Sequence, residues 1–324
     1  MSTTFSPARG LRNAHAQTIW PVLMRRPPVL PRVRERLELP DGDFIDLDWL
    51  DEAASGALAI VLHGLSGSAD SIYVLGIQQA LRAHGIGSVA MNFRGASGTP
   101  NRRARNYHGG DTGDVAALAA ALTARFPARP LLAIGYSIGA SMLVRWLGET
   151  GARNPLRAAC AVSVPFSLAA CSAQLDRGFS RIYRNRLRDD LLAGVRRKQA
   201  ALRAGGDPGE AAILDALGSL DGIVTFRDYD NRVMAPLHGF RDADDYYARC
   251  SPAQFMTSIA IPTCVLHARD DPFMTPDVVP RAVSASVEMR VSAHGGHVGF
   301  VGGSWRQPDY WLETAIPAFL QRHL

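Results

Sequence analysis

Short apolar runs alternate with amphipathic stretches through the first half of the chain. The pattern predicts strands at Val33–Leu39, Phe44–Trp49, Leu58–Leu62, Gly87–Phe93, Leu131–Gly135 and Ala158–Val164. Apolar residues at helical spacing predict helices at Ser71–His84, Thr112–Phe126 and Ile138–Leu147. Asp41-Gly42 separates the first two strands and predicts a hairpin turn. Because the later strands are apolar on both faces, we expect an α/β fold whose mostly parallel central sheet is flanked by helices.

The alternation stops after residue 165 and resumes near residue 256. The stretch 166–255 is rich in arginine and helical in pattern, without an apolar strand, which favours a helical cap or lid insertion. Strands are expected again at Ile261–His267 and Val287–Val291, followed by a closing helix over Tyr310–Leu324. The first 33 residues are polar and rich in proline. We therefore expect an N-terminal surface segment at 1–33 and one α/β core built from 34–165 and 256–324.

The composition adds limits on class and compartment. Hydrophobic residues make up 47% of the chain and charged residues 20%, which is typical of a globular protein. We find neither an apolar stretch of about 18 residues nor an apolar segment behind a charged N-terminus, so neither a membrane-spanning helix nor a secretory signal is expected. The four cysteines match no zinc pattern and are interpreted as reduced thiols. These observations predict a cytoplasmic protein.

The charge pattern says little about partners. The formal net charge is +5, and 34 of the 35 basic residues are arginines spread along the chain. No motif that reads nucleic acid accompanies them, so nucleic-acid binding is not expected. At most, the charge predicts a weak attraction to acidic surfaces or anionic lipids. We expect a monomer or a small homo-oligomer.

A serine motif carries the strongest chemical signal. Gly135-Tyr136-Ser137-Ile138-Gly139 has the form G-x-S-x-G, with an apolar strand before it and a helix pattern after it. A serine on such a strand-to-helix turn is exposed at the sheet edge, and its small neighbours let other chains pass closely. A serine that only begins the helix is the alternative. The strand and helix around the motif favour Ser137 as a nucleophile.

A serine hydroxyl needs a base to remove its proton. The candidate is His297, which follows the last predicted core strand in a loop with glycines on both sides. His294 is the competitor. Two histidines three residues apart could also bind a metal, but no third ligand lies near them in the sequence. We therefore favour catalysis and expect no metal and no cofactor.

The base needs a carboxylate to orient it, and the adjacent Asp270 and Asp271 follow the strand Ile261–His267. Adjacent side chains of an extended chain point in opposite directions, so only one of the two can serve. We choose Asp271, since a Pro272 turn follows it, and interpret Asp270 as a structural cap. The resulting order of nucleophile, acid and base is that of α/β-hydrolases.

Charge that develops on a substrate carbonyl oxygen needs preorganised donors. One is expected to be the Ile138 N–H, directly after the nucleophile. The other is expected to be the Leu65 N–H, in the loop His63-Gly64-Leu65-Ser66-Gly67 that follows a predicted strand. In this interpretation His63 orders the loop and is not a base.

With these residues in place, the sequence resembles the YheT-type (abhydrolase-4-like) branch of the α/β-hydrolase superfamily. The resemblance covers nearly the whole chain. Its motifs include Asn13-Ala14-His15-Ala16-Gln17-Thr18, His63-Gly64-Leu65, Met91-Asn92-Phe93-Arg94-Gly95, Tyr107 to Asp114, the serine motif, Ser163-Val164-Pro165-Phe166, Leu175-Asp176-Arg177-Gly178-Phe179, Ala235 to Phe240, His267 to Phe273 and His294 to Gly303. It implies carboxylic ester hydrolysis with Ser137, Asp271 and His297 as the triad. Ala14, Ala16, Gly109 and Ala140 depart from the family pattern and bear on substrate preference.

These observations predict a serine-dependent esterase that acts on a small acyl ester through an acyl-enzyme. We expect short- or medium-chain acyl esters or acylglycerols as substrates. Two alternatives stay open: an acyltransferase or thioesterase with the same triad, and a non-catalytic ligand-binding protein on the hydrolase fold.

Overall fold

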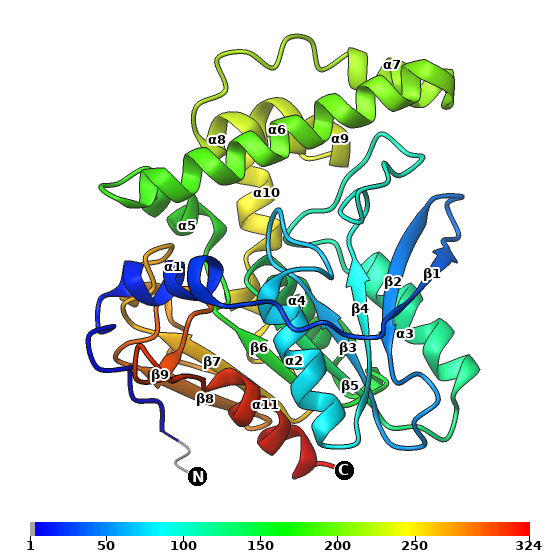
Figure 1. Ribbon diagram of the computed structural model, residues 1–324. Coiled ribbons are helices and arrows are strands. Elements are labelled where there is room, and N and C mark those ends of the chain that lie inside the picture. Colours follow the sequence, from blue (N-terminus) through cyan, green and yellow to red (C-terminus); the bar gives the residue numbers. More distant parts are fainter. Residues whose placement is uncertain (1–3) are drawn as a thin grey trace.

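A twisted eight-stranded sheet forms the centre of the computed structural model, which describes residues 4–324 (Figure 1). Residues 1–3 of the predicted N-terminal segment lie outside the described residues. In sequence order the sheet contains β1 (Val33–Glu38), β2 (Phe44–Leu50), β3 (Leu58–Leu62), β4 (Gly87–Asn92), β5 (Leu131–Tyr136), β6 (Leu156–Val162), β7 (Thr263–Ala268) and β8 (Val287–Ser292). Their order across the sheet is β1-β2-β4-β3-β5-β6-β7-β8.

The pairing confirms the predicted mostly parallel α/β sheet. From β4 across to β8 every neighbouring pair is parallel, whereas β1 pairs antiparallel with β2, and β2 pairs antiparallel with β4. Strand β3 is fully buried. Its Ile60 belongs to the core on one face of the sheet and its neighbour Val61 to the core on the other. Apolar residues at every position of this strand therefore serve two helical layers.

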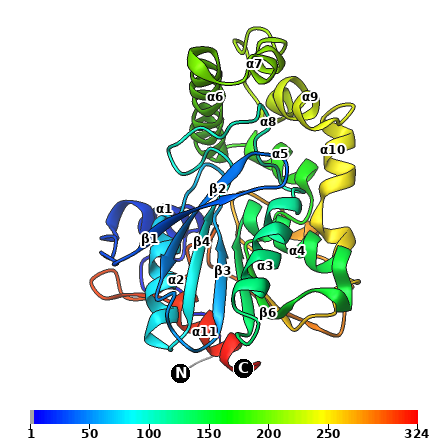
Figure 2. The ribbon, with the colours of Figure 1, turned by 90° about the vertical axis from the view of Figure 1, so that its right-hand side faces the viewer.

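Helices cover both faces of the sheet, as Figure 2 shows. On one face lie α2 (Ile72–Ala83) and α11 (Leu312–Gln321), and on the other lie α3 (Gly113–Arg125) and α4 (Ile138–Thr150). A single turn of 3-10 helix, η1 (Gly151–Arg153), follows α4. Each of these four helices was predicted to within a few residues from the spacing of its apolar positions.

The segment between β6 and β7 is helical and lies above the sheet edge at which β5 ends (Figure 1). It contains α5 (Leu168–Leu175), α6 (Ser180–Gly205), α7 (Pro208–Asp215), α8 (Phe226–Tyr229), the π-helical turn η2 (Asp230–Met234), α9 (Ala235–His238), α10 (Ala243–Cys250) and η3 (Pro252–Phe255). The Lys198 ammonium of α6 is buried and donates to the Arg105 carbonyl oxygen at 2.8 Å and to the Asn106 side chain. This contact joins the long helix to the loop after β4.

Three elements were not predicted. Helix α1 (Ala14–Met24) lies within the N-terminal stretch, and β9 (Val301–Gly303) and β10 (Pro308–Tyr310) form a separate two-stranded sheet after β8. A short turn, η4 (Pro276–Val278), follows β7. The Asn13 side chain caps α1 by accepting from the backbone N–H groups of His15 and Ala16. The fully buried Gln17 ties α1 to the chain at β9, because its side chain accepts from Val301 N and donates to Val301 O.

Candidate active site

The turn between β5 and α4 holds Ser137 in a strained backbone conformation. Its φ of 53° and ψ of −118° lie where residues with a Cβ are rarely found. The two glycines around it are required by close packing. A Cβ on Gly135 would lie 2.7 Å from Ala140 Cα, and a Cβ on Gly139 would lie 2.5 Å from the His63 carbonyl oxygen. The G-x-S-x-G pattern thus has a steric cause in this fold.

Three side chains from distant parts of the chain meet at this turn. Ser137 Oγ lies 2.9 Å from His297 Nε2, and His297 Nδ1 lies 2.8 Å from Asp271 Oδ2. The Asp271 side chain is 1% exposed and that of His297 is 9% exposed. A neutral imidazole that donates its Nδ1–H to the carboxylate presents Nε2 as an acceptor for the serine proton. The arrangement can therefore remove the Ser137 proton while the serine oxygen attacks an electrophile.

The competing pair lies apart from the serine. Asp270 Oδ2 is 3.2 Å from His294 Nδ1, and Asp270 Oδ1 accepts from Gly296 N at 3.0 Å. His294 is partly exposed. Asp270 thus braces the loop that carries His297, while Asp271 reaches the imidazole. Within residues 4–324 no group of three or more His, Cys, Asp or Glu side chains could hold a metal ion.

Three residues that were not among the predicted site residues hold His297 and its loop in place. The Thr18 hydroxyl of α1 accepts from His297 N at 2.9 Å, and the Ser163 hydroxyl accepts from Val298 N at 3.0 Å. The Phe273 ring stacks on the His297 imidazole, with centroids 3.9 Å apart and planes at 6°. The motifs that carried the family resemblance contain Thr18, Ser163 and Phe273. Those motifs were the sequence signal that could have identified these three residues.

The loop after β3 is ordered by a buried histidine. His63 Nδ1 lies 2.7 Å from the Gly64 carbonyl oxygen, and His63 Nε2 accepts from Phe93 N at 3.1 Å. Burial lowers the pKa of His63 to about 4, so the ring is neutral near pH 7. Gly64 N donates to the Tyr73 hydroxyl at 2.8 Å. These contacts agree with a loop-ordering role for His63.

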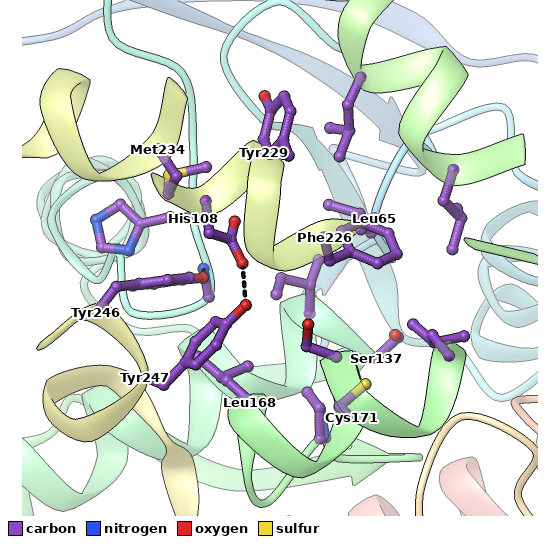
Figure 3. A pocket seen from close by; sticks show the side chains of 18 of the residues that line it. Leu65, His108, Ser137, Leu168, Cys171, Phe226, Tyr229, Met234, Tyr246 and Tyr247 are labelled. Atoms are coloured by element: carbon purple, nitrogen blue, oxygen red, sulfur yellow. Dashed lines mark hydrogen bonds between the residues drawn. The ribbon is translucent and has the colours of Figure 1, made fainter. Parts of the chain in front are cut away.

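Two cavities meet at Ser137. The smaller, of about 90 Å³, lies beneath the helices between β6 and β7, and its wall includes Leu65, Ile138, Leu168, Phe226, Met234 and Tyr247 (Figure 3). The larger, of about 400 Å³, is lined by residues of α1 and α6 and includes His297 in its wall. Leu65 and Ser137 line both. Ser137 thus lies between two cavities of different size.

Comparisons with known proteins agree with this architecture. The family model described as the alpha/beta hydrolase fold matches residues 60–304. YheT of Escherichia coli (strain K12) is 42% identical over 100% of this chain and 94% of its own length. Phospholipase ABHD3 of Mus musculus is 28% identical over 99% of this chain and 79% of its own.

Two further comparisons concern a shorter match and the fold. A monoacylglycerol lipase of Saccharomyces cerevisiae is 30% identical over 82% of this chain and 59% of its own length. A solved structure of the Pyrococcus furiosus esterase Pf2001 has the same fold, with a TM-score of 0.58, 17% identity, and coverage of 98% of this chain and 97% of that one. Among residues 4–324, none of the helices has the length and apolar character needed to cross a membrane. The chain belongs to the YheT-type branch of the α/β hydrolase family.

Proposed function

We propose that the protein is a serine esterase that cleaves carboxylic esters through an acyl-enzyme. The observation that carries this proposal is the continuous hydrogen-bond chain from Ser137 through His297 to Asp271 at a strained elbow. In this mechanism His297 takes the Ser137 proton as Oγ attacks the ester carbonyl, and then protonates the leaving alcohol. Water repeats the cycle on the acyl-enzyme. Asp271 holds the tautomer and stabilises the imidazolium.

The oxyanion hole in this proposal consists of the Leu65 and Ile138 N–H groups. Ile138 is the first residue of α4, where backbone N–H groups lack partners within the helix. Leu65 belongs to the loop that His63 and Tyr73 hold in place. Both residues border Ser137 in the wall of the smaller cavity. Two such donors stabilise negative charge without having to reorganise during the reaction.

The two cavities suggest how an ester would lie. The leaving alcohol must receive its proton from His297, which lines the larger cavity. The acyl group then occupies the smaller one, whose wall is mainly apolar. A space of this size suits short or medium acyl chains. The phospholipase and the monoacylglycerol lipase among the relatives support lipid-like esters or acylglycerols as the substrate class. We propose that 166–255 acts as the cap that shapes this acyl site.

The decisive experiment compares wild type with Ser137→Ala on p-nitrophenyl esters of graded chain length. We expect turnover to fall by roughly 10³- to 10⁶-fold, while the melting temperature stays close to that of wild type. Ser258→Ala, an exposed serine outside both cavities, is the matched control and should keep full turnover. A fluorophosphonate should label wild type but not Ser137→Ala. Equal turnover of Ser137→Ala and wild type would refute the proposal.

A further inference from the structure

The smaller cavity contains a buried carboxyl group that the proposed mechanism does not use. Asp230 is the first residue of η2, is 8% exposed, and lines this cavity together with Ser137. Its neighbours in the wall are mainly apolar, and include Leu168, Phe226 and Met234. A carboxyl group is costly to bury unless its oxygens find donors. Its place in an otherwise apolar acyl site therefore needs an explanation.

A hydrogen bond satisfies one of the two carboxyl oxygens of Asp230. The Tyr247 hydroxyl donates to Oδ2 at 2.6 Å, which is the dashed contact in Figure 3. Oδ1 accepts no hydrogen bond from the residues that the structure describes, and no cationic side chain in that range forms an ion pair with Asp230. The nearby Tyr246 hydroxyl is engaged with Gly109 N. The cavity wall thus holds a carboxyl group that Tyr247 fixes and that has an unused acceptor.

Electrostatics agree with this geometry. Burial raises the pKa of Asp230 to about 7, against the opposing effect of the Tyr247 hydrogen bond. A donor supplied by a ligand would stabilise the ionised form and offset the cost of burial. The rest of the wall suits hydrocarbon, so the fitting ligand is a carbon chain with one hydrogen-bond donor.

We infer that Asp230 is a specificity residue for ester substrates whose acyl chain carries a hydroxyl group, which donates to Oδ1 in the smaller cavity. The inference rests on the proposed esterase function of Ser137 and on the acyl group lying away from His297. It adds to that function a substrate class, hydroxyacyl esters. Sites built to bind a hydroxyl discriminate strongly against analogues that lack it, because the buried polar group is then left unpaired.

The test uses matched p-nitrophenyl esters. Butanoyl is compared with 3-hydroxybutanoyl, hexanoyl with 6-hydroxyhexanoyl, and each hydroxyacyl ester with its methoxy analogue, which cannot donate. In wild type we expect kcat/KM for one hydroxyacyl ester to exceed that of its parent by at least about tenfold, without a gain for the methoxy analogue. In Asp230→Leu the ratio should fall to about one, largely through the hydroxyacyl substrate.

Two further variants distinguish the effect of losing the carboxyl group from the effect of changing the shape of the cavity wall. Asp230→Asn keeps an acceptor and should retain part of the hydroxyl preference, and Met234→Leu reshapes the wall but should keep the preference. The inference is overturned if wild type hydrolyses the plain esters without preferring either hydroxyacyl ester, or if Asp230→Leu keeps the wild-type ratio. Should Asp230→Leu not fold, the wild-type ratios and Asp230→Asn still decide. Absence of hydrolysis of every ester would instead refute the proposed function.

Discussion

Two adjacent aspartates at the end of β7 contact different histidines. Asp271 is buried against His297, whereas Asp270 contacts His294 and the Gly296 N–H of the same loop. Sequence alone identified the pair and the reason why only one could orient the base. The choice of Asp271 rested on the Pro272 turn, because spacing alone does not show how the loop after β8 folds back over the sheet.

At the residue scale, we predict unequal effects of removing these two charges. Asp271→Asn should lower kcat by on the order of 10⁴-fold, because the amide can favour the wrong imidazole tautomer. Asp270→Asn should cause a much smaller loss, since it weakens only the support of the loop. Steady-state hydrolysis of one p-nitrophenyl ester by both variants provides the measurement. A larger loss for Asp270→Asn would mean that the roles are reversed.

Among the structural elements, α4 and β3 determine where the serine turn lies. Gly139 in the first turn of α4 sits against the backbone of Leu62 and His63, at the carboxyl end of β3. The strand that precedes the proposed oxyanion loop and the helix that follows Ser137 are therefore in direct contact. Any side chain at position 139 would push the two apart.

The matching prediction compares two glycine substitutions. Gly139→Ala should destabilise the protein by about 1–3 kcal/mol, as overpacking usually does, and should reduce turnover because the serine turn shifts. Gly205→Ala, at the end of α6, introduces a Cβ with nothing within 4 Å and should be neutral or stabilising by up to about 1 kcal/mol. Urea unfolding of both variants gives the two free energies. Equal effects would show that the contact is unimportant.

Strands that are buried on both faces of the sheet were predicted correctly from the sequence. Strand β3 was expected at Leu58–Leu62 and lies there, because an apolar run between polar turns allows few other structures. Helix α1 was missed because Pro21 lies inside it and only Gln17 of its residues is buried, so no apolar stripe marks it. Its contribution to the site, the Thr18 hydroxyl, depends on a contact with a loop 279 positions away along the chain. No local pattern encodes such a contact.

For the molecule as a whole, the sequence predicted that the site lies at one edge of the sheet, but it did not predict the cavities. Ser137, Asp271 and His297 each follow a predicted strand, which indicated one site at the carboxyl ends of a parallel sheet. The smaller cavity has walls from α5, α6, η2 and α10, which are separate in the sequence and pack together through long-range contacts. Asp230 was therefore not recognised as a site residue.

Stability should depend on pH through buried neutral histidines. Burial lowers the pKa of His63 to about 4 and of His108 to about 3, and it also lowers the pKa values of His238 and His267. Between pH 6.5 and about 5 the unfolded chain binds these protons and the folded chain does not, so the unfolding free energy decreases as the pH falls. Asp230, whose pKa is raised to about 7, has the opposite effect.

Urea unfolding between pH 7 and pH 5 measures this dependence. His63→Gln, which keeps a donor and an acceptor but does not titrate, should show a shallower decrease than wild type. An unfolding free energy that stays constant or increases as the pH falls from 7 to 5 would contradict this prediction.

The sole lysine of the chain has a practical consequence. Lys198 is 3% exposed and is engaged with the loop after β4, and burial lowers its pKa to about 7. The cationic side chains that stay charged near pH 8 are therefore all guanidinium groups. Reagents that acylate side-chain amines therefore find no lysine on the surface of the folded protein. Because arginine side chains stay protonated in alkali, the surface also keeps its positive charges at alkaline pH. If α6 detaches from the core, a single new amine becomes reactive, and its modification records that opening.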